Sequence, residues 1–457
     1  MLPCFTTTHI APIPIHLVTA VTFAAWLNQQ SAFIQTWLQA SQFRAEPNQM
    51  RLLPDETGHV SGVIYCVTDV ENSWEVGQLP FFLPEGVYQL TVHHHDTNIA
   101  YATSWALGAY QFTRYKNATR QPAQLHVSAE VLSAVAPIVE SIYYVRDWIN
   151  TPTEEMGPSE FAAVAQQLAK EFHAKFHQLI GEELLAQNYH CIYTVGRASH
   201  DAPRLLDLRW GDAAHPQVTL VGKGVCFDSG GLDLKPSSAM LLMKKDMAGG
   251  AHALGLARMI MSAQLPIRLR VLIPVVENVI GGNAYRPGDV IKSRQGMTVE
   301  VGNTDAEGRL ILADALAEAV SEQPALLIDF STLTGAARVA LGTELPAVFS
   351  NNDSLVAAVI KHGEQQADLM WRLPLYAPYR DYLNSQIADI NNNSSEPYGG
   401  AITAALFLKA FVPDQIPWLH FDMMAWNLRA RPGRPVGGEA MTLRAVMSYL
   451  CDVYTRL

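Results

Sequence analysis

The segment 303–310 reads Asn-Thr-Asp-Ala-Glu-Gly-Arg-Leu and places two carboxylates, Asp305 and Glu307, just ahead of Arg309. Side chains two apart on an extended backbone point the same way, so a strand predicted at 297–301 that continues into this loop would direct all three at one site. Two acids that share a site repel each other and stay ionised together only with a cation between them, which predicts a metal ion. This segment alone leaves open a strand-to-helix turn with a solvated Asp and Glu.

A second segment, 223–246, favours the metal site. It contains Lys223, Asp228, Lys235 and Asp246, so the two segments together supply four carboxylates. Oxygen-rich sites suit Mg, Mn or Zn, and bridging carboxylates hold paired ions about 3.5–4 Å apart in two-metal hydrolases.

Glycines accompany both segments and are assigned roles in the backbone. Gly230 and Gly231 are expected to let the main chain approach the site closely. Gly308 is expected to let the chain turn before a helix over 310–322.

The two motifs, Lys-x4-Asp-Ser-Gly-Gly-x3-Lys-Pro-x9-Asp and Asn-Thr-Asp-Ala-Glu-Gly-Arg, resemble those of the leucine aminopeptidase (cytosol aminopeptidase) family of dinuclear metallopeptidases. The segments 146–152, 332–336 and 399–405 also resemble family segments. The similarity covers roughly residue 101 to the C-terminus and is weaker before that.

The resemblance implies two divalent ions per subunit, Zn or Mn and possibly Mg. By this resemblance Asp228 and Glu307 would bridge both ions. Asp305 would complete the readily exchanged site, and Lys223 and Asp246 would complete the tighter one. A lysine ligand must be the neutral amine, which metal coordination can enforce.

The same resemblance assigns the reaction. A metal-bridging hydroxide would attack the first peptide bond and release N-terminal amino acids, leucine-like or otherwise neutral, from short peptides. Lys235 would donate to the developing gem-diolate oxygen, and Arg309 would hold a bicarbonate ion that acts as the general base.

The pocket for the substrate side chain is assigned in the same way. Met243 and Thr332 resemble pocket-lining positions, and Gly335 lies near them in the chain. Met424 follows Asp422 where the family often has small residues, so it is expected to narrow or reshape the pocket. The remaining charged neighbours are assigned to structure or solvent: Asp233, Lys244, Lys245 and Asp314.

The pattern from about residue 190 onward alternates strands and helices. Strands are predicted at 218–221, 267–275, 325–330 and 418–422, with a helix at 247–263 between the first two. This order predicts an α/β fold of two domains, each a sheet flanked by helices, with a mixed, largely parallel central sheet in the catalytic one. Asp228, Asp305 and Thr332 each follow a predicted strand, and ligands lie outside the carboxyl ends of the strands in such sheets.

The chain of 457 residues is expected to contain an N-terminal α/β domain (1–128), a connecting helix (129–150) and a catalytic metallopeptidase domain (151–457). The sequence also predicts helices over 101–115 and 158–176, a polar loop over 391–395, and a cluster of ordinary surface or core histidines at 93–95.

Composition limits the classes of function. The formal net charge of −11 and the absence of a basic run argue against nucleic-acid binding, although a DNA-binding accessory role remains an alternative because some family members have one. Five scattered cysteines without a CxxC pair favour a reducing cytoplasm. The apolar stretch 13–27 lacks the preceding positive charge of a signal peptide, and no membrane association is expected. The resemblance also implies a homohexamer, and an inactive relative that keeps only the assembly is the other alternative.

Overall fold

The computed structural model describes residues 2–8, 11–91 and 95–455. Its contacts divide the chain into two compact units, Met1–Tyr143 with Arg429–Val436, and Tyr144–Leu428 with Gly437–Leu457. The division falls within α5 (Ala129–Asn150). This helix has the same bounds as the helix predicted over 129–150. The domain boundaries at 128 and 150 stay predictions. Of the histidine cluster, His93 and His94 lie outside the described residues.

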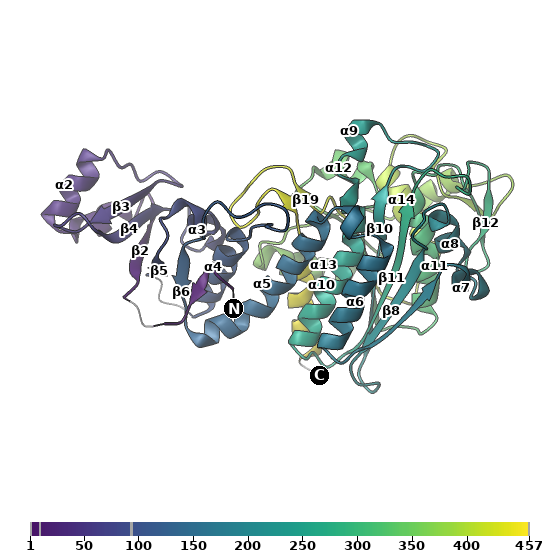
Figure 1. Ribbon diagram of the computed structural model, residues 1–457, viewed down its shortest axis with the longest axis horizontal. Coiled ribbons are helices and arrows are strands. Elements are labelled where there is room, and N and C mark those ends of the chain that lie inside the picture. The colour runs from purple at the N-terminus through teal and green to yellow at the C-terminus, as the bar shows by residue number, and fades with distance from the viewer. Residues whose placement is uncertain (1, 9–10, 92–94, 456–457) are drawn as a thin grey trace. The chain divides into compact units, whose positions relative to one another are not determined.

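The first unit contains a sheet in the order β1-β6-β5-β2-β4-β3 (Figure 1). Its strands are β1 (Phe5–Thr6), β2 (Ile13–Val18), β3 (Met50–Pro54), β4 (Val60–Cys66), β5 (Val87–Leu90) and β6 (Gln124–His126). All neighbours are parallel except β3 and β4. Its helices are α1 (Phe23–Asn28), α2 (Ala32–Ala40), α3 (Leu79–Phe82) and α4 (His95–Gly108), with a 3-10 turn η1 (Ser73–Gln78).

One helix of this unit is shorter than predicted. The helix expected over 101–115 is α4, which begins earlier and ends at Gly108. A Cβ on Gly108 would lie 1.6 Å from the carbonyl oxygen of Gly77, so α4 and η1 approach each other closely at the end of the helix.

The second unit is organised around a sheet in the order β16-β15-β18-β14-β9-β11-β8-β7, with β10 also paired to β11. Its strands are β7 (Lys175–Ile180), β8 (Arg204–Trp210), β9 (Gln217–Gly222), β10 (Gly224–Asp228), β11 (Arg268–Asn278), β14 (Leu326–Ser331), β15 (Ala347–Ser350), β16 (Trp371–Arg372) and β18 (Trp418–Asp422). The central strands β18, β14, β9 and β11 are mutually parallel, whereas β8 and β15 join them in antiparallel orientation. The predicted α/β fold with a mixed, largely parallel sheet is confirmed.

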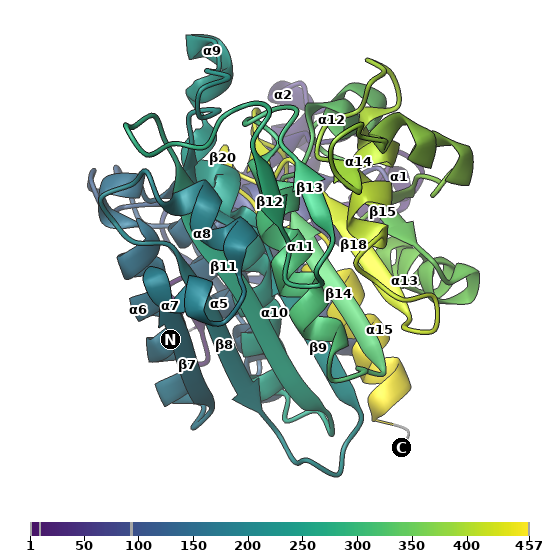
Figure 2. The same ribbon diagram turned by 90° about the vertical axis from the view of Figure 1, so that its right-hand side faces the viewer.

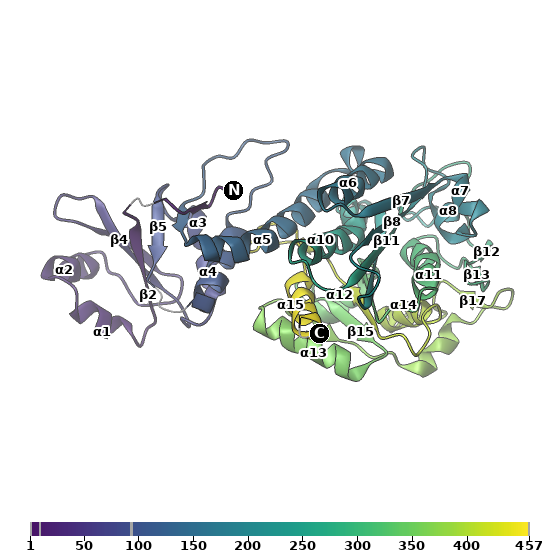
Figure 3. The ribbon, with the colours of Figure 1, turned by 90° about the horizontal axis from the view of Figure 1, so that it is seen from below.

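Helices cover both faces of this sheet (Figures 2 and 3). One face is covered by α6 (Pro158–Glu171), α10 (Ala248–Ser262), α13 (Asp353–Gln365) and α15 (Leu443–Tyr454). The other is covered by α7 (Glu182–Ala186), α8 (His190–Gly196), α11 (Glu307–Val320) and α14 (Gly400–Lys409). The predicted helix over 158–176 is too long, because the chain after α6 turns at His173, where φ is 53°, and enters β7.

A small sheet, β12 (Val290–Lys292), β13 (Thr298–Glu300) and β17 (Ile390–Asn391), lies beside α11 (Figure 2). The sequence suggested that Asp305 follows a strand of the main sheet. It instead follows β13, which belongs to the small sheet. A short ribbon pairs β19 (Trp426–Asn427) with β20 (Gly437–Gly438), and further turns are η2 (Thr153–Glu155), α9 (Ser237–Met240), η3 (Met243–Met247), α12 (Gly335–Leu341) and η4 (Ala377–Leu383).

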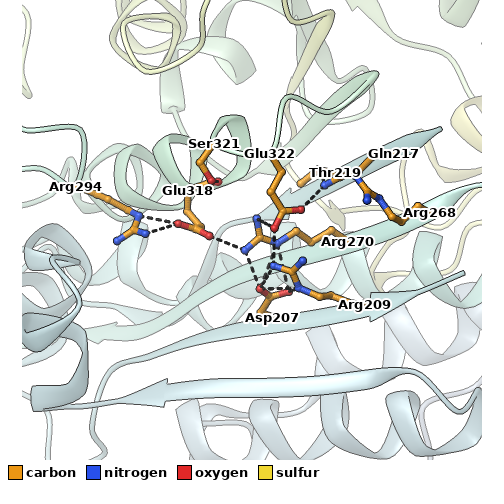
Figure 4. Close-up of polar contacts among 10 residues, drawn as sticks. All are labelled: Asp207, Arg209, Gln217, Thr219, Arg268, Arg270, Arg294, Glu318, Ser321 and Glu322. Carbon is orange, nitrogen blue, oxygen red and sulfur yellow. Dashed lines mark hydrogen bonds and ion pairs between the residues drawn. The ribbon is translucent and has the colours of Figure 1, made fainter. Parts of the chain in front are cut away.

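A group of ion pairs joins the start of β11 to β8 and to the end of α11 (Figure 4). Arg270 is buried in β11 and lies 2.8 Å from Asp207, 2.7 Å from Glu318 and 3.2 Å from Glu322. Figure 4 also shows Arg294 on the far side of Glu318. Asp207 of β8 and Glu318 of α11 therefore come from elements that pack on the same strand, and Glu322 lies two residues beyond the end of α11.

Among the described residues, none of the helices combines the length and the apolar character needed to cross a membrane.

Candidate metal centre

Four carboxylates and two lysines from separate segments meet in the second unit. Lys223 joins β9 to β10, and Asp228 ends β10. Asp246 lies in η3, Asp305 in the loop after β13, and Glu307 is the first residue of α11. The structure thus brings all four carboxylates of the two sequence motifs to one place.

Three of these acids form a group with the spacing of metal ligands. Asp228, Asp305 and Glu307 each offer a carboxylate oxygen, and these oxygens all lie within 4.8 Å of one another. Glu307 is 1% exposed, and its Oε2 has no hydrogen-bond partner among the residues that the structure describes. A buried carboxylate oxygen without a donor fits a divalent cation that accepts oxygen ligands, such as Mg, Mn or Zn.

Two lysines lie among the carboxylates. The Lys223 Nζ is 2.8 Å from Asp246 Oδ2 and 2.8 Å from Glu307 Oε1. The Lys235 Nζ is 2.8 Å from Asp228 Oδ2 and also contacts Asp305. Burial opposes the charged amines, yet the surrounding carboxylates raise the pKa of both lysines above the usual value. A metal ion beside Lys223 would have to displace this proton before the amine became a ligand.

The carboxyl groups respond to the same crowding. Burial and the neighbouring charge of Asp228 raise the pKa of Glu307 to about 8 and that of Asp305 to about 6. Burial also acts on Asp246, but Lys223 and Lys245 lower its pKa overall. The centre therefore concentrates more negative charge than its two lysines neutralise, which favours an additional cation.

Residues outside the sequence motifs orient the acids. The Thr332 hydroxyl donates to Asp246 Oδ1 at 2.7 Å, and Asn278 Nδ2 donates to Asp228 Oδ1 at 2.8 Å. Asn278 also donates to the carbonyl of Thr304, as does the Tyr285 hydroxyl at 2.6 Å. Asn278 and Tyr285 were missed from the sequence; the signal available was that Asn278 ends β11, three residues beyond the predicted strand.

Asn392 fixes the loop that carries Asp305. Its side-chain oxygen accepts hydrogen bonds from the backbone N–H groups of Gly302 and Asn303, and its Nδ2 donates to the Asn303 carbonyl. Asn392 is fully buried, so the polar loop expected over 391–395 is in part a buried support of the site. Arg309 Nη1 donates to the Asn392 carbonyl at 2.6 Å, and burial lowers the pKa of Arg309 to about 10.

The backbone geometry proposed for the acidic motif is wrong in one respect. Helix α11 begins at Glu307, so Glu307 and Arg309 lie on helical rather than extended backbone. Gly308 is inside this helix and makes no turn; a Cβ there would lie 2.7 Å from Lys223 Nζ. Gly230 and Gly231 do provide the expected close approach, with φ of 89° and 65°.

The residues assigned to the side-chain pocket lie on three segments. Met243 is buried in η3, Thr332 follows β14, and Gly335 is the exposed first residue of α12. Met424 is half-buried after β18. Thr332 holds Asp246 with its hydroxyl, a role that the pocket assignment did not anticipate.

The charged residues assigned to structure or solvent divide into different environments. Asp314 is structural, since it accepts the backbone N–H groups of Cys191, Ile192 and Arg294. Asp233 accepts the backbone N–H of Thr304 at 2.7 Å. Lys244 is half-buried and donates to the carbonyl of Asn150.

Lys245 is not a solvated residue. It is 1% exposed, and its Nζ has no hydrogen-bond partner in the described part of the chain. Burial lowers its pKa to about 7; the negative charge of Asp246 opposes this shift, and the positive charges of Arg338 and Lys223 add to it.

Comparison with known proteins gives the same assignment along most of the chain. Residues 143–447 match the catalytic domain of the cytosol aminopeptidase family, and residues 13–128 match the N-terminal domain of M17 aminopeptidases. A probable cytosol aminopeptidase of Rhodopirellula baltica is 38% identical over 82% of this chain and 74% of its own length.

Solved structures agree. The crystal structure of a cytosol aminopeptidase from Coxiella burnetii covers 99% of both chains with a TM-score of 0.96 and 51% identity. The bottromycin maturation enzyme BotP, in complex with Mn, covers 97% of this chain and 100% of its own with a TM-score of 0.87 and 29% identity.

Proposed function

Because the chain belongs to the cytosol aminopeptidase family, we propose that it is a dinuclear metal-dependent aminopeptidase that releases N-terminal residues from short peptides. One observation carries the proposal. Asp228, Asp305 and Glu307 converge within 4.8 Å, and an oxygen of the buried Glu307 has no donor among the described residues.

The metal-ligand roles are proposed on the same basis. Asp228 and Glu307 would hold both ions, Asp305 would complete one site, and Lys223 and Asp246 would complete the other. The Mn bound to the related BotP supports a divalent ion, and we propose Zn or Mn, with Mg as a further candidate. When bound, the ions would supply Lewis-acid chemistry, activating water and polarising the scissile carbonyl.

Two cationic side chains complete the proposed machinery. Lys235 contacts both Asp228 and Asp305, so its ammonium is positioned to donate to the oxygen that gains negative charge during attack. Arg309 presents a buried guanidinium at the start of α11, and we propose that it would hold a bicarbonate ion, which would supply general-base chemistry there.

Assembly and compartment extend the proposal. We propose a homohexamer on the family resemblance, to be measured by light scattering coupled to size-exclusion chromatography. The five cysteines are free thiols, which supports a reducing cytoplasm.

Hydrolysis after metal replacement tests the function. The protein is treated with chelator, reconstituted with Mn or Zn, and assayed on leucine p-nitroanilide and unlabelled dipeptides. Asp305→Ala is expected to lose bound metal and activity. Lys235→Ala is expected to keep its metal while turnover falls about 10²–10³-fold. Glu364→Ala, which removes an exposed carboxylate from α13, serves as the matched control.

The decisive contrary result is a folded, metal-loaded protein that cleaves no peptide with any of the three ions. The same protein would then be assayed for salt-dependent duplex binding, the function that the net charge argues against.

A further inference from the structure

Lys245 is a buried amine that the proposed mechanism does not use. It lies in η3 between Lys244 and the proposed ligand Asp246, two residues after Met243 of the proposed side-chain pocket. Its Nζ is buried and has no hydrogen-bond partner among the described residues. A buried ammonium or amine without a partner is unfavourable unless something else binds it.

The acids near Lys245 are already held by other donors. Asp246 is bound by Lys223 at 2.8 Å and by the Thr332 hydroxyl at 2.7 Å. Asp422 accepts the backbone N–H groups of Leu333 and Thr334 and the Thr334 hydroxyl. Neither acid forms an ion pair with Lys245 in the described structure.

Arg338 is a second cation with a buried, unpartnered nitrogen among the described residues. It lies one helical turn after Gly335 on α12, and its Nη2 is 3.7 Å from the place that a Cβ on Gly335 would occupy. Its Nη1 is buried and also lacks a hydrogen-bond partner among the described residues. The guanidinium therefore folds back toward Gly335, and Arg338 is within electrostatic range of Lys245.

These observations describe a candidate anion site. Each of two positive groups has a buried nitrogen without a hydrogen-bond partner among the described residues, and each comes from an element that contributes to the proposed pocket. A carboxylate accepts hydrogen bonds from both an ammonium and a guanidinium, and such charge-assisted bonds are strong when water is excluded.

We propose that Lys245 and Arg338 together bind the carboxylate of an acidic side chain on the substrate's N-terminal residue, so that the enzyme prefers N-terminal Glu or Asp to neutral residues. This inference rests on the proposed function. It assigns the two cations to substrate selection, whereas the attacking and proton-transfer steps belong to the centre described above.

The test compares substrates that differ in charge but little in shape. We would measure kcat/KM for Glu-Leu, freshly prepared Gln-Leu and Leu-Leu with the Mn-reconstituted protein. The wild type is expected to favour Glu over Gln by at least about tenfold, because a buried site built for a charged group rejects a ligand that lacks the charge. Arg338→Met and Lys245→Met are each expected to lower the Glu/Gln ratio at least about tenfold.

Two further variants separate charge from structure. Arg338→Lys keeps a positive charge on α12 and is expected to retain most of the Glu preference. Lys361→Met removes an exposed positive charge from α13 and is expected to keep the wild-type ratio. If Lys245→Met does not fold, the comparison of Arg338→Met with Arg338→Lys decides the question by itself.

Several outcomes would overturn the inference. A Glu/Gln ratio near or below one, with Leu-Leu readily cleaved, would remove the acidic preference and leave the aminopeptidase proposal intact. An equal loss on all three substrates in Arg338→Met would indicate a structural role only. A ratio near one combined with Leu-Leu rates that change when chloride is replaced by gluconate would show that an inorganic anion occupies the cations. Cleavage of no substrate would overturn both proposals.

Discussion

The amine of Lys223 lies directly against the backbone of Gly308. A Cβ on Gly308 would be 2.7 Å from Lys223 Nζ and 2.7 Å from its Cε, closer than side chains approach. Lys223 enters from the β9–β10 junction, whereas Gly308 is the second residue of α11. The absence of a side chain at 308 therefore allows the lysine to reach Glu307 and Asp246 past the start of the helix.

Gly308→Ala is expected to displace Lys223 from the carboxylates. Overpacking of this kind costs about 1–3 kcal/mol, and here the strain falls on a proposed metal ligand. We expect metal affinity at the tighter site to fall at least about tenfold, measured by calorimetric titration of the chelated protein. Gly282→Ala is the matched control, because a Cβ there meets nothing within 4 Å. Unchanged metal affinity in Gly308→Ala would contradict the proposed role of Lys223.

Thr332→Val tests whether this threonine supports the metal centre or shapes the pocket. Valine keeps the shape but removes the hydroxyl that donates to Asp246 Oδ1 at 2.7 Å. The loss of such a supporting hydrogen bond typically weakens metal binding about 10–100-fold. We expect metal titrations of Thr332→Val to show that loss of affinity. At saturating metal, the variant should rank peptide substrates in the same order as the wild type. Thr332→Ser, which retains the hydroxyl, should bind metal like the wild type; a changed substrate ranking with normal metal affinity would favour the pocket role.

Metal-free protein is expected to lose stability as the pH rises, relative to a variant without the Glu307 charge. The folded pKa of Glu307 is about 8, above the ordinary 4.5, so the folded state holds its proton more tightly than the unfolded chain. The stabilisation from that proton is fully present below pH 4.5 and is lost as the pH rises through about 8. Asp305, raised from 3.8 to about 6, contributes in the same direction over a lower range.

The measurement is the free energy of unfolding of chelated protein in urea at pH 5, 6.5 and 8. We expect wild type to fall relative to Glu307→Gln by an amount on the order of a few kcal/mol between the first and last pH. Added Mn should restore the wild type most strongly at pH 8, where the ionised carboxylate binds the ion without releasing a proton. A constant difference between the two proteins across this range would refute the proposed protonation of Glu307.

Local sequence patterns were sufficient for much of the fold. The strand predicted at 418–422 is β18, and the long helix predicted at 129–150 is α5. Both are segments in which the apolar spacing continues over the whole element and ends at a clear signal, such as the Asn-Thr-Pro that follows α5.

The candidate site was predictable where its residues stand close together in the chain. Two pairs of site residues form recognisable patterns in the sequence. Asp228 and Lys235 belong to one loop, and Asp305 and Glu307 belong to one strand-to-helix junction. Asn392 supports that junction from more than 80 residues away, and only the folded chain places it there. The error about extended backbone at Glu307 has a related cause, since a period-two and a helical spacing cannot be separated over three residues.

The ion pairs of Arg270 allow stability to be separated from catalysis. Arg270 lies near the start of β11, and Asn278, which contacts Asp228, ends the same strand. Eight residues of strand span roughly 26 Å, so the two ends of β11 do not share contacts. Of the acids around Arg270, Asp207 lies in β8, Glu318 in the last turn of α11, and Glu322 just beyond that helix (Figure 4).

Arg270→Met is expected to destabilise the fold by about 1.5–3 kcal/mol, because it removes the buried charge-assisted hydrogen bonds to Asp207 and Glu318, while Arg209 and Arg294 still pair with these acids. Urea unfolding of the metal-loaded protein measures this loss. The unfolding free energy of Arg270→Lys should lie between those of the wild type and Arg270→Met, because lysine keeps the charge but lacks the planar guanidinium. Below the unfolding transition, kcat on the preferred dipeptide should match that of the wild type. A fall in kcat without a fall in stability would mean that the start of β11 is coupled to the metal centre, and the separation argued from the length of the strand would fail.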